Sequence, residues 1–171
     1  YGILNGTTNY ILTRMTDDGG DFDEMLGQAQ ENGYAEADPT MDIDGTDAAQ
    51  KLALLCRIAF GVGLSPEHIL KEGISQVSPL DINFARELGY TIKLLAIAKA
   101  VEDRIEARVH PALIPSGALL ANILVRIRRM AGGDGIQPRR QFTQQTHEIL
   151  TGNTLDRVVL HQVDNESAMH V

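Results

Sequence analysis

The stretch from Gly33 to Lys51 constrains the fold more than any other part of this sequence. It is interrupted by proline and glycine, and it then begins an apolar helix that carries one lysine. Its five carboxylates are Glu36, Asp38, Asp42, Asp44 and Asp47. Carboxylates held close together repel one another, so a folded loop of this composition needs a positive counter-charge. The candidates are a metal ion, the ammonium group of a substrate, and the side chain of Lys51.

The metal candidate rests on the run from Asp42 to Gly45, which has some likeness to a calcium-binding loop. If Gly45 takes the sixth position of an EF-hand loop, the twelfth position falls on Lys51, where the motif needs a bidentate glutamate. A cation at that position is incompatible with the motif. The five histidines of the chain show no metal-ligand spacing either. We therefore predict no metal site.

Lys51 is the second candidate, because Asp47 precedes it by four residues on a predicted helix and both side chains project from the same face. A surface ion pair of this kind is worth only ~0–1 kcal/mol and has no function of its own. However, Lys51 begins an otherwise apolar helix beside the acidic loop, which places it at the edge of a cleft. There its ammonium group can donate a proton to a carbonyl oxygen that gains negative charge.

The composition is that of a globular protein with one sizeable core: 171 residues, of which 43% are hydrophobic. A net charge of -8 argues against nucleic acid or an anionic membrane as a partner. No apolar run approaches the ~20 residues of a membrane span. The single cysteine, Cys56, lies in an apolar helix and is predicted to be a buried hydrophobic residue. A reducing, cytoplasmic compartment fits this cysteine usage.

Hydrophobic periodicity and turn residues predict helices first and strands afterwards. Thr7 or Thr8 is expected to cap the first helix. The helix that contains Lys51 is almost wholly apolar after this residue, so it is expected to be covered on most sides. The expected helices are 8–15, 22–31, 47–62 and 79–88, and the expected strands are 91–101 and 105–111. This order predicts an α+β fold in which helices pack on one face of an antiparallel or mixed sheet.

The pattern changes near Ile123. Residues 1–123 are predicted to form the folded domain, whereas residues 124–171 are rich in arginine and lack a clear period, which predicts an irregular or divergent tail. A shifted reading frame would give such a tail, and a divergent or engineered terminus is the alternative. Because Tyr1 begins abruptly in strand-like sequence, the chain is expected to be a piece of a longer protein.

Three motifs resemble the catalytic region of the homoserine dehydrogenases, and they occur in order with ordinary spacing. They are NGTTNYIL from residue 5, GYAEADP from residue 33 and DIDGTDAAQKL from residue 42. The likeness extends through HPALIP at residues 110–115 to LAN at residues 120–122. It therefore covers the predicted domain and does not include the tail.

The resemblance implies an oxidoreductase that interconverts L-homoserine and L-aspartate 4-semialdehyde, on the route to threonine, methionine and isoleucine. In that family the lysine that matches Lys51 is the proton donor and acceptor at the substrate hydroxyl, with the aspartate that matches Asp47 beside it. The positions implied to hold the amino acid or to line its pocket are Glu36, Asp42, Thr7 and Tyr34.

The resemblance also implies NAD or NADP as the cofactor. The family's Rossmann domain is not matched here, since no G-x-G-x-x-G follows a strand, so this chain alone is expected to be inactive and to bind neither dinucleotide. Asn5 and Gly6 are our cofactor-binding candidates, with an ordinary turn as the alternative. The family's catalytic domains associate through their sheets, which implies a homodimer. One competing hypothesis is a non-enzymatic module that binds a small ligand or a cation. Another is a dimerisation unit.

Overall fold

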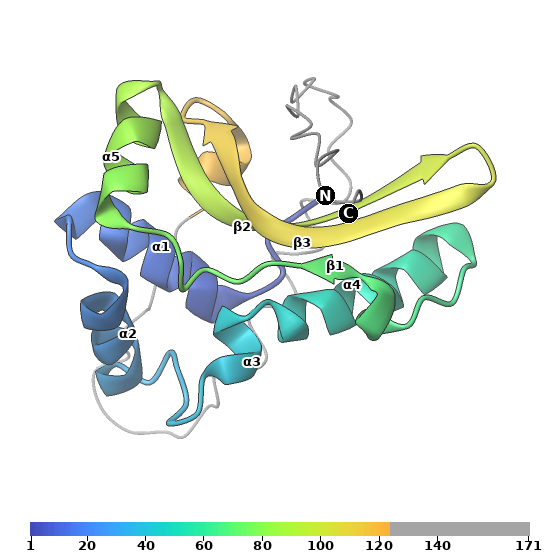
Figure 1. Ribbon diagram of the computed structural model, residues 1–171, viewed down its shortest axis with the longest axis horizontal. Coiled ribbons are helices and arrows are strands. Elements are labelled where there is room, and N and C mark those ends of the chain that lie inside the picture. The colour runs from blue at the N-terminus through green and yellow to red at the C-terminus, as the bar shows by residue number, and fades with distance from the viewer. Residues whose placement is uncertain (124–171) are drawn as a thin grey trace, which may run out of the picture.

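The structure is a computed structural model that describes residues 1–123 (Figure 1). The predicted tail, 124–171, lies outside the described residues. The elements are α1 (Gly6–Asp18), α2 (Phe22–Glu31), α3 (Thr40–Ile43), α4 (Thr46–Phe60), the 3-10 helix η1 (Pro66–His68), β1 (Leu70–Lys71), α5 (Pro79–Glu87), β2 (Tyr90–Val101), β3 (Arg104–Pro115) and the 3-10 helix η2 (Leu119–Asn122). Within residues 1–123, no helix is long and apolar enough to cross a bilayer.

The strands form a mixed sheet in the order β1-β3-β2. The long β2–β3 hairpin is antiparallel, whereas β1 pairs in parallel with β3. The N-terminal segment joins the other edge of β2, because Gly2 and Ala96 exchange two backbone hydrogen bonds of 2.9 Å each. Helices α1, α4 and α5 all pack against β2. The predicted α+β class and the mixed form of the sheet are therefore confirmed.

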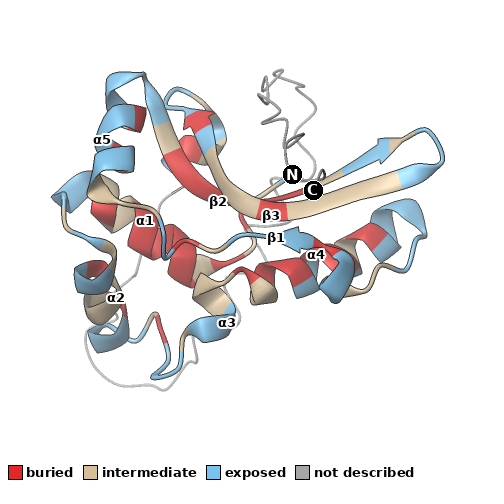
Figure 2. Ribbon diagram, viewed as in Figure 1, coloured by how far each residue is buried: buried red, intermediate tan, exposed pale blue. Residues whose placement is uncertain are grey.

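Residues 92–97 in the middle of strand β2 are buried on both faces of the sheet, as the red segment of β2 in Figure 2 shows. Successive side chains of a strand point to opposite sides. Leu94 and Ala96 accordingly belong to the main core, which the helices form with the sheet. Leu95 and Ile97 belong to a second, smaller cluster, which is completed by Ile3, Ile114 and Ala121. The sheet is thus held from both sides near the start of the hairpin.

The first helix begins earlier than the sequence predicts. Its N-cap is Asn5, whose Oδ1 accepts a hydrogen bond of 2.8 Å from the backbone N–H of Thr8, so the expectation of a cap at Thr7 or Thr8 is wrong. Asparagine is at least as good an N-cap as threonine, which explains the choice. Helix α2 has the predicted bounds, whereas the four-residue helix α3 is too short to show a hydrophobic period.

Within residues 1–123 helix α4 is covered along one stripe, so the expectation that it is covered on most sides is wrong. Leu54 is 65% exposed and Ile58 is 81% exposed. The helix buries one stripe, made by Ala48, Ala49, Leu52, Ala53 and Cys56. Three of these residues are alanines, so the helix can approach the sheet closely along that stripe. Cys56 is buried as predicted, and burial raises the pKa of its thiol.

Strand β3 runs to Pro115 and so passes through Pro111, where the sequence analysis ends it. Proline lacks the N–H that a central strand needs for its ladder. However, β1 pairs with β3 only at Arg108 and Val109. Beyond Val109, no strand within residues 1–123 pairs with the β1 side of β3, so there the missing N–H of Pro111 costs no ladder hydrogen bond.

Candidate active site

Asn5 brings the N-terminus of α1 against two carboxylates from the following elements. Its Nδ2 donates to Asp42 Oδ1 at 2.7 Å and to Asp47 Oδ2 at 2.9 Å. The capping bond from Thr8 holds the amide oxygen toward the helix, so the amide nitrogen faces the carboxylates. One buried side chain thus joins α1 to α3 and to α4.

Thr7 fixes the other oxygen of Asp42. Its hydroxyl oxygen lies 3.0 Å from Asp42 Oδ2 and 2.9 Å from the backbone oxygen of Tyr34, so its single proton is shared between two acceptors. With Asn5 on Oδ1 and Thr7 on Oδ2, the carboxylate of Asp42 is held in one orientation. Both donors come from the first turn of α1 and its cap, which makes this helix the support of the acidic group.

Lys51 lies beside Asp47, as the spacing predicts. Its Nζ donates to Asp47 Oδ2 at 2.6 Å and to the backbone oxygen of Leu4 at 3.2 Å. The side chain of Lys51 is 49% exposed and that of Asp47 is 27% exposed. Within residues 1–123 these two contacts use two of the three N–H donors of the ammonium group. A ligand in solvent can therefore reach the ammonium group while Asp47 holds it.

Asp44 has a structural task in the turn between α3 and α4. It accepts hydrogen bonds from the backbone N–H of Thr46 at 2.8 Å and from its hydroxyl at 2.9 Å, and Lys71 lies 3.5 Å away. Burial alone would raise the pKa of Asp44, but these bonds and the Lys71 ammonium lower it overall. Gly45, with φ of +84°, completes the turn in a conformation that favours glycine. The turn sets the spacing between Asp42 and Asp47.

Gly73 lets a distant part of the chain support the same turn. A Cβ at this position would lie against the backbone oxygen of Ile43 and 2.7 Å from the Cα of Asp44. The neighbouring N–H of Ile74 donates to the oxygen of Ile43 at 2.9 Å. The two backbones touch directly, which only glycine permits. The sequence analysis missed Gly73, because no local pattern marks a contact with a segment almost thirty residues away.

Tyr34 packs against helix α1. Its ring stacks on Tyr10 of α1 with centroids 4.2 Å apart, and the Arg14 guanidinium lies 5.9 Å from the centre of the Tyr10 ring. Burial, and secondarily Tyr10, raises the pKa of the Tyr34 hydroxyl. Glu36 follows two residues later on an exposed loop, where its backbone oxygen accepts a hydrogen bond of 3.1 Å from Gln30.

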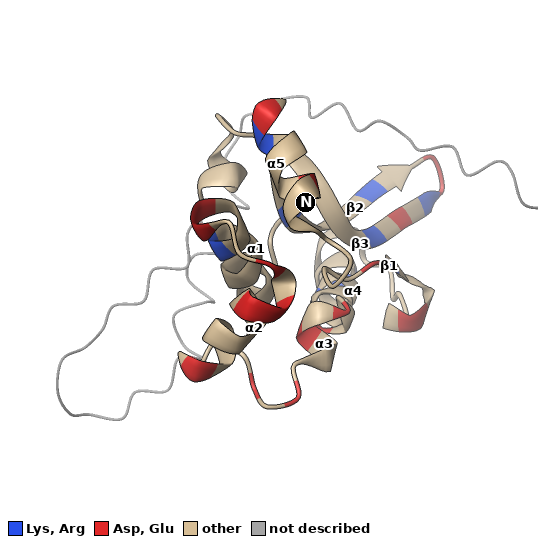
Figure 3. Cartoon of the chain, turned by 60° about the vertical axis from the view of Figure 1, so that its left-hand side comes forward, with Lys and Arg blue, Asp and Glu red and all other residues tan. Residues whose placement is uncertain are grey.

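The structure thus brings most of the predicted site residues into one network. Its members are Asn5, Thr7, Asp42, Asp47 and Lys51, with Tyr34 joined through its backbone. Acidic residues mark α3 and the loop before it in Figure 3. Among residues 1–123, no group of three or more His, Cys, Asp or Glu residues is arranged to hold a metal ion. The roles of these residues, and that of Glu36, stay predictions.

Carboxylates lie near the N-termini of the longer helices among the described residues. A pyrophosphate binds to the free N–H groups of a helix N-terminus, which a neighbouring carboxylate makes unfavourable. Each described helix of eight or more residues has a carboxylate at that end: Asp42 and Asp47 beside α1, Asp21 and Asp23 on α2, Asp47 on α4 and Asp81 on α5. The assignment of Asn5 and Gly6 to cofactor binding stays a prediction.

Lys93 is a buried charged residue that the sequence analysis did not single out. It is buried in β2, and its ammonium donates to Asn9 and Thr13 of α1. The available signal was a lysine within the apolar run of a predicted strand. Such a lysine usually lies on an exposed face, so the sequence gives no reason to expect a buried charge.

Comparison with known proteins connects this site to a family. The family model for homoserine dehydrogenase matches residues 1–128. The homoserine dehydrogenase of Pseudomonas aeruginosa is 48% identical over 136 residues, which is 79% of this chain and 31% of that protein. The homoserine dehydrogenase of Synechocystis is 55% identical over 126 residues, covering 71% of this chain and 29% of that protein.

Solved structures agree with the sequence matches. A homoserine dehydrogenase from Thiobacillus denitrificans superposes with a TM-score of 0.69 at 56% identity, covering 71% of this chain and 28% of that one. A hyperthermophilic archaeal homoserine dehydrogenase mutant, solved in complex with NADPH, gives a TM-score of 0.51 at 28% identity over 69% of this chain and 32% of that one. The chain spans 28–31% of the length of its more similar relatives. It belongs to the homoserine dehydrogenase family, as its three motifs predict.

Proposed function

We propose that this chain supplies the substrate side of a homoserine dehydrogenase active site, in which Lys51 moves the proton. The observation that carries the proposal is the half-exposed Lys51 ammonium, held 2.6 Å from Asp47 next to a second fixed carboxylate, Asp42. The reaction interconverts L-homoserine and L-aspartate 4-semialdehyde. The nicotinamide cofactor, when bound by another part of the enzyme, supplies or accepts the hydride.

The proton step follows from the position of Lys51. When the aldehyde is reduced, its oxygen gains negative charge, and the ammonium of Lys51 donates a proton to it and becomes a neutral amine. In the oxidation of homoserine, the neutral amine takes the proton of the hydroxyl group. Asp47 holds the Nζ in place in both directions. The hydrogen bond that Lys51 Nζ donates to the backbone oxygen of Leu4 limits the movement of the side chain further.

The acidic loop suits the other end of the substrate, which carries an ammonium group. Asp42 is held rigid by Asn5 and Thr7, so it can receive a cation without first being ordered. We assign Glu36, on the exposed loop, to the same ammonium group. Tyr34 lines this side through its backbone oxygen and its stacked ring. We thereby assign substrate recognition to Asp42 and Glu36, and proton transfer to Lys51 beside Asp47.

The finer parts of the proposal rest on the family relation. The archaeal relative in complex with NADPH supports NADP or NAD as the cofactor and does not decide between them. We further propose a cytoplasmic enzyme of threonine, methionine and isoleucine biosynthesis that acts as a homodimer. A homoserine titration followed by NMR separates this function from a non-enzymatic cation-binding module, since calcium rather than homoserine would then shift the resonances of the acidic loop.

Glu36→Ala is expected to raise the KM for homoserine about tenfold and to leave kcat nearly unchanged. The carboxylate is proposed to hold the substrate ammonium equally in the ground state and the transition state, which is the signature of uniform binding, and one bond to a charged group accounts for roughly this loss. Steady-state kinetics of the full-length enzyme that carries this sequence measure both constants. Glu67→Ala, an exposed acid on η1, is the matched control. An unchanged KM would remove Glu36 from the substrate site.

A further inference from the structure

Lys93 carries a buried charge that the proposed mechanism does not use. Its side chain is 1% exposed. Burial lowers its pKa from the usual 10.5 to about 8, and the carboxylate of Asp17 acts in the opposite direction. Lysine is almost never fully buried without a charged partner. Within residues 1–123 the hydrogen-bond partners of this ammonium are neutral oxygens, so its burial costs stability.

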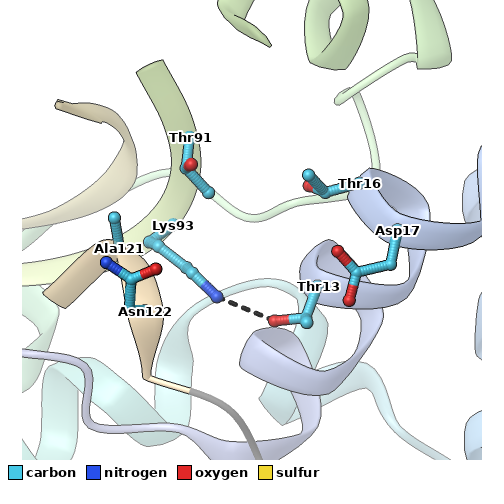
Figure 4. Close-up of a pocket in the computed structure, with 7 residues that line it drawn as sticks. All are labelled: Thr13, Thr16, Asp17, Thr91, Lys93, Ala121 and Asn122. Atoms are coloured by element: carbon cyan, nitrogen blue, oxygen red, sulfur yellow. Dashed lines mark hydrogen bonds between the residues drawn. The ribbon is translucent and has the colours of Figure 1, made fainter. Parts of the chain in front are cut away.

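The ammonium of Lys93 joins three parts of the fold. It donates to Asn9 Oδ1 at 2.8 Å and to Thr13 Oγ1 at 2.7 Å, one turn apart on α1. Its third contact is the backbone oxygen of Ile123 at 3.4 Å, which also accepts from Asn9 Nδ2 at 3.2 Å. All three N–H donors therefore tie β2 to α1 and to the residue after η2. Figure 4 shows Lys93 reaching from the strand to Thr13.

We call the three hydrogen bonds of the Lys93 ammonium the Lys93 clamp. A cavity of about 250 Å³ lies beside it, lined by Thr13, Thr16, Asp17, Thr91, Lys93, Ala121 and Asn122. Because Lys93 lines this cavity, we expect its ammonium to exchange protons with solvent there without unfolding. Asp17 is the charged group that faces it from α1 (Figure 4). The β3 partner of Lys93 is Ala112, and η2 consists of uncharged residues. In this part of the described chain, one carboxylate, that of Asp17, thus stabilises the positive charge of Lys93.

Helix α1 connects the Lys93 clamp to the candidate active site. Asn9 lies one helical turn from Asn5, and the helix between them is continuous. Asn5 and Thr7 are the donors that hold Asp42, and Asn5 also holds Asp47. A rotation or slide of α1 relative to β2 would move both donors together. The hydrogen bonds of Lys93 to Asn9 and Thr13 oppose such a movement.

We propose that Lys93 is a positioning residue, which fixes α1 against β2 so that Asn5 and Thr7 stay aligned with the carboxylates of the site. As far as activity is its readout, this inference rests on the proposed function. The charged form is the effective one. A neutral amine has two N–H donors instead of three, so deprotonation releases one of the three anchors.

Lys93→Met is expected to lower kcat about 10-fold to 100-fold in the full-length enzyme that carries this sequence, because a displacement of about 1 Å in a catalytic group has an effect of this size. The KM for the dinucleotide is expected to stay unchanged. Lys99→Met is the matched control, since Lys99 is an exposed lysine on the same strand. Normal kcat in Lys93→Met would overturn the inference.

The pH profile distinguishes positioning from general stability. In the wild-type enzyme kcat is expected to fall as the pH rises through about 8, the pKa of Lys93. Asn9→Asp places a carboxylate on the ammonium, which favours the charged form and should move this fall to higher pH. If Lys93→Met does not fold, Asn9→Asp alone decides the question, since an unmoved alkaline limb would contradict the role of Lys93.

An NMR measurement on the 171-residue chain separates this inference from the proposed function. The side-chain amide resonance of Asn5 is expected to shift with a midpoint near pH 8 in the wild type and not in Lys93→Met. One outcome is that the full-length enzyme does not oxidise homoserine, while the Asn5 resonance still shifts near pH 8 in the wild type and not in Lys93→Met. The proposed function then fails and the positioning role stands. The other outcome is that homoserine is oxidised, but the pH-dependent shift of the Asn5 resonance is the same in Lys93→Met as in the wild type. Only the positioning role then fails.

Discussion

Lys51→Ala is expected to lower kcat for homoserine oxidation by ~10²-fold or more, the usual contribution of a general acid or base. The full-length enzyme that carries this sequence should meanwhile remain folded, because an ion pair as exposed as Lys51 and Asp47 contributes only ~0–1 kcal/mol to stability. Steady-state kinetics measure the first effect and thermal unfolding measures the second. Lys99→Ala, on the exposed part of β2, should change neither.

A graded result is expected from the partner of Lys51. Asp47→Asn leaves the ammonium in place but replaces the charged acceptor that holds it 2.6 Å away, so kcat should fall less than in Lys51→Ala. The amide can still accept from Lys51, although more weakly than a carboxylate. If Lys51→Ala kept near-normal turnover in a folded enzyme, Lys51 would be a surface ion-pair partner of Asp47 and the proton step would need another residue.

Asn5→Asp is expected to cost roughly 3 kcal/mol of unfolding free energy at pH 7, as when a buried charge is left without a partner. Aspartate caps a helix as well as asparagine does, so the loss isolates the charge. In the native structure Asn5 donates to Asp42 and Asp47 at 2.7 and 2.9 Å. The variant replaces this donor with a third carboxylate, which can only repel the other two.

The pH dependence of Asn5→Asp follows from the same repulsion. Neighbouring carboxylates raise the pKa of the introduced group above its unfolded value of about 4, so the cost is present at neutral pH and disappears as the pH falls toward that value. Urea unfolding of the variant and the wild type at pH 7 and pH 4.5 measures the difference. Asn83→Asp, the same change on exposed α5 beside Arg86, should cost little at either pH. An equal loss at both pH values would show that packing, not charge, is responsible.

Local patterns predicted those parts of the fold whose causes are local. The apolar spacing of α2 gives its bounds, and the four-residue spacing of Asp47 and Lys51 gives their contact. Contacts between distant segments left no such trace. Asn5 reaches Asp42 and Asp47 across 37 and 42 positions, and Lys93 reaches Asn9 across 84. Such pairs depend on how the elements pack, so the sequence names the residues and not their partners.

Burial shows the same limit in a different form. The composition of α4 says that the helix is apolar and cannot say how much of it the rest of the chain covers. Within residues 1–123 a single stripe is covered, while Leu54 and Ile58 remain exposed. Pro111 is the converse case, because its tolerance in β3 depends on where the pairing with β1 ends.

The backbone contact at Gly73 makes position 73 a vulnerable one without any chemistry of its own. Because any Cβ would push against Ile43 and Asp44, every substitution should displace the turn that spaces Asp42 and Asp47. In a library of single variants, position 73 should accept as little variation as Lys51. The loss should appear as reduced folded protein at position 73 and as slow turnover of a well-expressed protein at Lys51. A selection scored on growth alone would group the two positions, and a parallel measurement of abundance would separate them.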